Sequence, residues 1–117
     1  MLDVGRVINV TSVSVKEPLN YLVLSNSIRS AVVAWAKSLS VDIGKDGITI
    51  NSILTGYFDT ERIKELNKEK SESLNICENE VLEKMKSLVP ANRLGKIDEF
   101  GYLVSFLSSD KAAYING

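Results

Sequence analysis

The sequence predicts an α/β fold in which a βαβ unit with parallel strands is followed by C-terminal helices. Two short runs of β-branched residues flank a long stretch in which apolar residues recur every three or four positions. Shorter helical patterns fill the second half of the 117-residue chain. A strand, a helix and a strand within about 50 residues usually form a right-handed crossover between adjacent parallel strands. The chain is therefore expected to form one modest domain at most.

A run of β-branched residues after Gly5 predicts the first strand, which ends in a loop of hydroxyl-bearing residues. The run contains Val7, Ile8, Val10 and Val13, and the loop contains Thr11, Ser12 and Ser14. A helix is predicted from about Asn20 to Ile43, with an apolar stripe wide enough to be covered on more than one side. Gly44 and Gly47 end this helix, and Ile48 to Leu54 form the second strand.

The carboxyl ends of the two strands are the expected functional edge of this unit. Ligands bind outside the carboxyl ends of the strands in open parallel sheets. Ser12 and the segment from Thr55 to Thr60 should therefore lie on the same rim.

The second half of the chain starts with a strongly polar segment after Asp59 and Thr60, either of which can cap a helix. We expect residues 61–89 to form an exposed, mobile excursion that contains a helix from about Glu78 to Leu88. Pro90 ends that helix, and a last helix should run from about Ile97 to Leu107.

Composition excludes several classes of function. The 14 basic and 15 acidic residues are interspersed, which argues against nucleic acid or an anionic membrane as a partner. Histidine, the commonest general base and metal ligand, is absent, so no metal site is expected. The single cysteine, Cys77, has polar neighbours and is expected to be an ordinary reduced thiol. These features, with no membrane-length apolar run, favour a cytoplasmic location.

Four segments in register resemble short-chain dehydrogenases/reductases of the 3-oxoacyl-[acyl-carrier-protein] reductase type. They are Gly5–Ser12, Gly47–Ile53, Pro90–Gly95 and Ser108–Gly117. The resemblance covers essentially the whole chain and implies a partial Rossmann-like (doubly wound) fold. It also leads us to expect that residues 1–117 are the C-terminal portion of an NAD(P)-binding domain, without the glycine-rich turn that holds the pyrophosphate and without a final strand.

The resemblance implies that catalysis requires a serine, a tyrosine and a lysine four residues after the tyrosine. Ser12 stands at the serine position, but Leu22 and Asn26 stand at the tyrosine and lysine positions. A phenol ionises near ~10, so the family's lysine matters for the proton transfer that its tyrosine performs. Tyr21 lies one residue away, and a helix would turn its ring in another direction. The altered motif is compatible with decay or with a divergent branch of the family.

The segment Thr55–Thr60 resembles the family's loop at the nicotinamide. This resemblance implies cofactor contacts from Gly56, from the backbone of Phe58 and from the hydroxyl of Thr60, although Thr60 could simply cap a helix. Thr55 replaces the family's proline. The excursion 61–89 then corresponds to the family's substrate lid.

Two functional hypotheses follow. The first is a fragment of an oxidoreductase that uses NAD or NADP to interconvert carbonyls and secondary alcohols in its parent, with no tight cofactor binding or activity by this chain alone. The second is a non-catalytic module that self-associates. In the family the long helix contributes to a dimer contact, so a dimer or tetramer is expected under both hypotheses.

Overall fold

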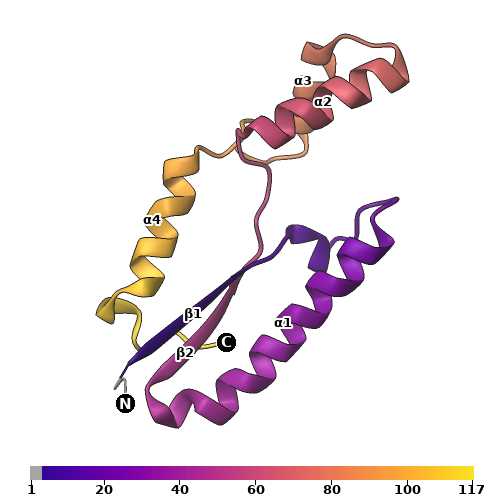
Figure 1. The fold of residues 1–117 in the computed structure, drawn as a ribbon. Helices are drawn as coiled ribbons and strands as arrows, with labels where there is room; N and C mark the ends of the chain where they lie inside the picture. Colours follow the sequence, from indigo (N-terminus) through magenta and orange to yellow (C-terminus); the bar gives the residue numbers. More distant parts are fainter. Residues whose placement is uncertain (1–3) are drawn as a thin grey trace. The chain divides into compact units, whose positions relative to one another are not determined.

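A computed structural model of the protein describes residues 4–117 (Figure 1). The chain forms two compact units. The first unit contains the residues up to Gly56 and returns at Gly101–Gly117, whereas the second unit contains Tyr57–Phe100. No helix in residues 4–117 combines the length and the apolar character needed to cross a membrane.

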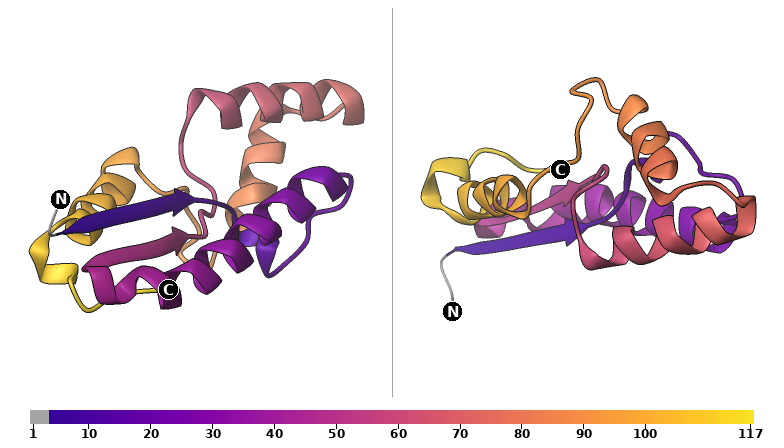
Figure 2. Two further views of the ribbon diagram at one scale, coloured as in Figure 1. Left: turned by 60° about the horizontal axis from the view of Figure 1, so that its bottom comes forward. Right: turned by 90° about the horizontal axis from the view of Figure 1, so that it is seen from above.

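The first unit is built on the predicted βαβ arrangement of β1 (Gly5–Val10), α1 (Val23–Ile43) and β2 (Ile48–Ile53). The two strands are parallel, with Gly5 opposite Ile48 and Val10 opposite Ile53. Figures 1 and 2 show the strands side by side, with α1 running along them. The predicted α/β fold class is therefore confirmed.

The end of β1 and the start of α1 differ from their predicted positions, and the local backbone conformation explains both differences. Val13 does not extend β1, because a short 3-10 turn, Val13–Val15, starts immediately after Ser12. The helix starts at Val23 rather than near Asn20 because Tyr21 has a φ of 65°, a left-handed conformation that a right-handed helix cannot include. At the other end of α1, Gly47 has a φ of 73° and allows the chain to turn into β2.

One side of α1 is more exposed than the sequence pattern suggested. Ala36 is buried, as is Ile50 of β2. In contrast, Val23, Leu24 and Trp35 are 77%, 73% and 54% exposed. The expectation that this helix is covered on more than one side is wrong for residues 4–117, because these residues include a single two-stranded sheet and no second layer over that stripe.

The end of the chain lies beside β2. The Asn116 side chain accepts a hydrogen bond from the Ile50 amide at 2.9 Å and donates one to the Ser40 carbonyl at 2.9 Å. The Gly117 amide donates to the Ile50 carbonyl at 2.8 Å. One asparagine therefore joins α1 to β2.

The second unit contains a pair of helices, α2 (Glu61–Leu74) and α3 (Glu78–Ser87), followed by the start of α4 (Ile97–Ser108). Asn75 ends α2 in a left-handed conformation, with a φ of 52°. The predicted helices in this half are confirmed to within one residue at each end, and the polar segment that opens the excursion is the helix α2.

Candidate functional site

Threonine hydroxyls and peptide groups join the carboxyl ends of the two strands. The hydroxyl of the buried Thr11 donates to the Ile53 carbonyl at 3.1 Å, and the Thr55 hydroxyl donates to the Thr11 carbonyl at 2.7 Å. The Val13 amide donates to the Thr55 carbonyl at 3.0 Å. These bonds bring Ser12 to the same rim as Thr55 and its neighbour Gly56, as the strand order predicted.

Ser12 is partly buried and caps the short turn that follows β1. Its hydroxyl oxygen accepts a hydrogen bond from the Ser14 amide at 3.2 Å. A serine hydroxyl can accept one bond and still donate its own proton. The observed capping role is therefore compatible with the carbonyl-orienting role that the family resemblance implies for Ser12.

Leu22 and Asn26 flank the first turn of α1, and both have contacts that support the local structure. Leu22 is the residue before the helix, is 46% exposed, and accepts a 2.8 Å bond from the Asn26 amide through its carbonyl. The side-chain amide of Asn26 donates to the Leu19 carbonyl at 2.9 Å. Asn26 therefore fastens the preceding loop to α1, and its Oδ1 atom is buried without a partner in residues 4–117.

Tyr21 lies outside α1. The sequence-based argument that helical rotation turns its ring away from the tyrosine position is therefore wrong. Helical rotation cannot decide where its ring points, because its left-handed backbone precedes the first turn of α1. The side chain is fully exposed. Nothing in residues 4–117 therefore holds the phenol in a fixed position.

Phe58, in the second unit, forms a bridge with Gly95. The Gly95 amide donates to the Tyr57 carbonyl and the Asp59 amide donates to the Gly95 carbonyl, both at 2.9 Å. These bonds leave the peptide N–H and C=O of Phe58 itself without partners in the described part of the chain. The phenylalanine ring lies over Gly95, where a Cβ atom would be 2.7 Å from the ring, and it meets Phe100 edge-on at 5.7 Å between centroids.

Thr60 caps α2. Its hydroxyl oxygen accepts a 3.3 Å hydrogen bond from the Ile63 amide, as the simpler interpretation of this residue predicted. As with Ser12, the hydroxyl proton remains able to donate. The structure therefore places Phe58 and Thr60 in one short segment that has a free peptide group and a hydroxyl two residues apart.

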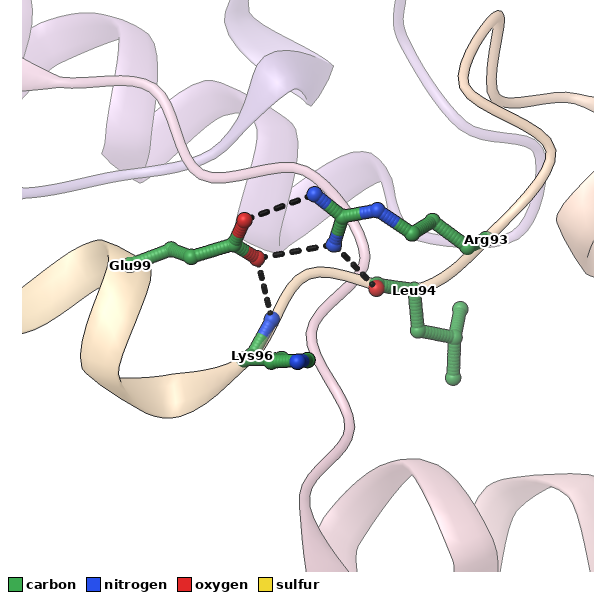
Figure 3. Close-up of polar contacts among 4 residues, drawn as sticks. All are labelled: Arg93, Leu94, Lys96 and Glu99. Atoms are coloured by element: carbon green, nitrogen blue, oxygen red, sulfur yellow. Dashed lines mark hydrogen bonds and ion pairs between the residues drawn. The ribbon is translucent and has the colours of Figure 1, made fainter.

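An ion pair that was not predicted from the sequence stabilises the N-terminus of α4. Arg93 contacts both carboxylate oxygens of Glu99, at 2.6 and 2.8 Å, and Glu99 also accepts a 2.7 Å bond from the Lys96 amide (Figure 3). The hydrogen bonds from Arg93, then that from Lys96, lower the pKa of Glu99 to about 2. The glutamate three residues after Lys96 is the sequence signal of such a cap.

The ion pair predicts a pH dependence of stability. Glu99 has a lowered pKa in the folded protein, so its contribution is present above its ordinary pKa near 4.5 and is lost as the pH falls toward about 2. Urea denaturation between pH 6 and pH 2 should therefore show a smaller loss of stability for Glu99→Gln than for the unchanged protein. Glu65→Gln, which removes an exposed pair with Arg62, is the matched control. An identical pH profile for Glu99→Gln and the unchanged protein would contradict this assignment.

Residues 4–117 contain no group of three or more candidate metal ligands. Near the strand ends and the following loop, Ser12, Phe58 and Thr60 offer hydroxyl and peptide groups for hydrogen bonding.

Comparisons with known proteins cover the whole chain. Residues 1–117 match the family model described as "Enoyl-(Acyl carrier protein) reductase". The NADPH-dependent reductase BacG of Bacillus subtilis (strain 168) is 27% identical over 98% of this chain and 44% of its own length. The 3-oxoacyl-[acyl-carrier-protein] reductase FabG of Haemophilus influenzae is 33% identical over 97% of this chain and 42% of its own length.

A solved structure shows the same arrangement of elements. The short chain dehydrogenase family protein from Francisella tularensis subsp. tularensis SCHU S4 superimposes with a TM-score of 0.92 and 25% identity, over 98% of this chain and 48% of that one. The chain thus spans less than half the length of the relatives it matches.

Proposed function

Since this chain belongs to the short-chain dehydrogenase/reductase family, we propose that it is part of an oxidoreductase scaffold that does not catalyse carbonyl reduction by itself. The proposal rests on the sequence resemblance, which puts Leu22 and Asn26 at the positions of the family's tyrosine and lysine. Leucine has no proton to transfer. The amide of Asn26 carries no charge and already donates to the Leu19 carbonyl. With this assignment, the two positions hold neither the acid nor the ammonium that the reaction needs.

Ser12 could still contribute to the reaction in a parent protein. When bound, a nicotinamide dinucleotide supplies or accepts the hydride in this class of chemistry. Ser12 would donate its hydroxyl proton to the carbonyl oxygen while its oxygen stays bonded to the Ser14 amide. A hydrogen bond of this kind orients the carbonyl, but it does not replace the missing proton transfer.

The nicotinamide end of a dinucleotide fits the second unit's loop in part. The free N–H and C=O of Phe58 suit a carboxamide, which needs one acceptor and one donor. The Thr60 hydroxyl can donate to a phosphate while it caps α2. In the first unit, Gly56 has open space where a Cβ would be, so a ligand could approach its backbone. The neutral Asn26 does not fit the family's ribose contact. We therefore propose NAD or NADP as the cofactor of the parent, and weak binding by this chain.

Two assays on the purified chain test this proposal. Titration with NADH and with NADPH, followed by cofactor fluorescence, should show no saturation up to millimolar cofactor. The chain should also fail to oxidise NADPH in the presence of acetoacetyl-CoA, a small 3-oxoacyl thioester. A full-length 3-oxoacyl-[acyl-carrier-protein] reductase serves as the positive control. Saturable micromolar binding would overturn the claim about the cofactor, and turnover above background would overturn the claim about catalysis.

The exposed side of α1 favours a second candidate function, a self-associating module. Leu24 and Trp35 project more than half of their surface from this helix, and burial of such apolar surface favours association. We propose a dimer or tetramer formed through this helix. Light scattering should give at least twice the 12.9 kDa chain mass, and Trp35→Glu should lower that mass. Tyr102→Glu, at another aromatic residue on α4 that is more than half exposed, is the control. A monomer at all concentrations would contradict the proposal.

A further inference from the structure

The helices α2 and α3 meet over a small contact, and the most buried side chain of α2 is polar. Asn67 is 6% exposed and is the only buried residue of α2, and Val81 is the only buried residue of α3, in the described chain. Figure 2 shows the two helices crossing rather than running side by side. The element against which α2 packs is α3, so the burial of Asn67 depends on that contact.

The carboxamide of Asn67 is not satisfied in this position. Its Oδ1 atom is buried and has no hydrogen-bond partner in residues 4–117. Because Oδ1 is covered by the described residues, a group from a longer parent chain cannot reach it unless α2 or α3 moves. A buried acceptor without a donor favours any state in which water can reach it. The closed arrangement of α2 and α3 therefore has a cost that separation of the two helices removes.

Little apolar surface of α2 opposes this cost. The side chains one helical turn before and after Asn67 are Ile63 and Ser71, and both are only partly buried. The other apolar residues of α2, Leu66 and Leu74, are 38% and 54% exposed. Hydrophobic stabilisation scales with the apolar area removed from water, so the packing of α2 on α3 is weak.

Both ends of α2 are capped by bonds that do not involve α3. At the start of the helix, the Thr60 hydroxyl accepts a bond from the Ile63 amide at 3.3 Å. At its end, the Ser71 hydroxyl donates to the Ile76 carbonyl at 2.6 Å, and the left-handed Asn75 donates its amide back to carbonyls of α2. The caps of α2 can therefore persist when the helix moves away from α3.

The start of α2 is fixed to the segment that contains Phe58. The Asp59 amide, directly before the Thr60 cap, donates to the Gly95 carbonyl at 2.9 Å, beside the bridge between Phe58 and Gly95. The bonds at the other end, at Asn75, are to α2 itself. Movement of α2 away from α3 would therefore pivot near Thr60, next to the free peptide group of Phe58.

From these observations we propose that α2 opens away from α3, and that the unsatisfied carboxamide of Asn67 keeps the open state accessible. In the open state water binds Oδ1, and the segment from Phe58 to Thr60 acts as the hinge. Burial of Ile63 and Val81 favours the closed state and desolvation of Asn67 favours the open one, so the two states are closely balanced. The inference concerns contacts within the second unit and does not depend on the proposed oxidoreductase scaffold.

Amide hydrogen exchange of the full ¹⁵N-labelled chain tests the proposal. Asn67→Leu removes the unsatisfied group and adds apolar surface, so exchange of the amides in α2 and α3 should slow about tenfold. Asn67→Asp keeps the size of the side chain but buries a charge, so the same amides should exchange about tenfold faster at neutral pH. Exchange at Ile50 in β2, in the first unit, should not change in either variant, because the opening is local.

The same two substitutions at Asn79, an exposed position on α3, are the matched controls. Asn79→Leu and Asn79→Asp should each change exchange in these helices by less than about threefold, since helix propensity and surface charge have small effects. Unchanged amide shifts in β2 establish that each variant is folded. Equal slowing by Asn67→Leu and Asn79→Leu would assign the effect to helix propensity and overturn the proposal. Unchanged or faster exchange in Asn67→Leu would also overturn it, because the amide would then be satisfied in the closed state.

Discussion

Replacement of Ile50 by alanine is expected to lower the free energy of unfolding by about 3 kcal/mol, because it removes buried side-chain atoms and leaves a cavity. Ile50 is 1% exposed and is the largest fully buried side chain in residues 4–117. It lies at the centre of β2 opposite Val7 and lines a pocket with Val33 of α1. Urea denaturation followed by far-ultraviolet circular dichroism measures the loss.

Two further variants calibrate this result. Ile50→Val removes one methylene group from the same site and should cost about 1 kcal/mol. Ile97→Ala changes an isoleucine that is 63% exposed at the start of α4 and should change stability by less than about 0.5 kcal/mol. Equal losses for Ile50→Ala and Ile97→Ala would show that Ile50 is not the packing centre of the first unit.

Asn116→Ala should cost about 2 to 3 kcal/mol although Asn116 itself is exposed. The change removes the acceptor of the Ile50 amide and the donor to the Ser40 carbonyl, both of which belong to partly buried pairs. The larger part of the cost comes from the Ile50 amide, which is left without its acceptor. Amide exchange at Ile50, with urea denaturation, measures the local and global effects.

Asn116→Asp separates the two bonds, since aspartate keeps the acceptor for Ile50 and loses the donor for Ser40. Its cost should fall between those of the unchanged protein and Asn116→Ala. Asn79→Ala, at an exposed position on α3, is the control and should be nearly neutral. If Asn116→Ala leaves Ile50 exchange unchanged, the chain end does not protect β2.

The βαβ unit was predictable because its signals are local. The spacing of apolar residues distinguishes strands from helices. A connection of this length between two strands allows few topologies. The ends of the strands and helices were less predictable, because the hydrogen bonds and backbone angles of single residues determine them. Ser12 starts a turn through a bond to the next residue but one, and the backbone of Tyr21 turns left-handed. Neither feature is visible in periodicity.

The position of the candidate site was predictable, but the hydrogen bonds of its individual residues were not. The rim that contains Ser12 and Gly56 follows from strand order. The contact between Asn26 and the Leu19 carbonyl spans seven residues and depends on the path of an exposed loop, which no local pattern specifies. The free peptide group of Phe58 likewise depends on Gly95, which is distant in sequence.

The discontinuous first unit affects the order in which the protein can fold during synthesis. Ile50 and Asn116, which bond to each other, are 66 residues apart in the chain. At about 5–20 residues per second, a ribosome takes roughly 3 to 13 s to make that interval. The helices of the second unit depend on local contacts and can form within it, whereas β2 waits with its Ile50 edge unprotected. A nascent chain therefore exposes that edge for seconds before Asn116 and Gly117 can cover it, and during this interval the edge is most open to binding by a chaperone.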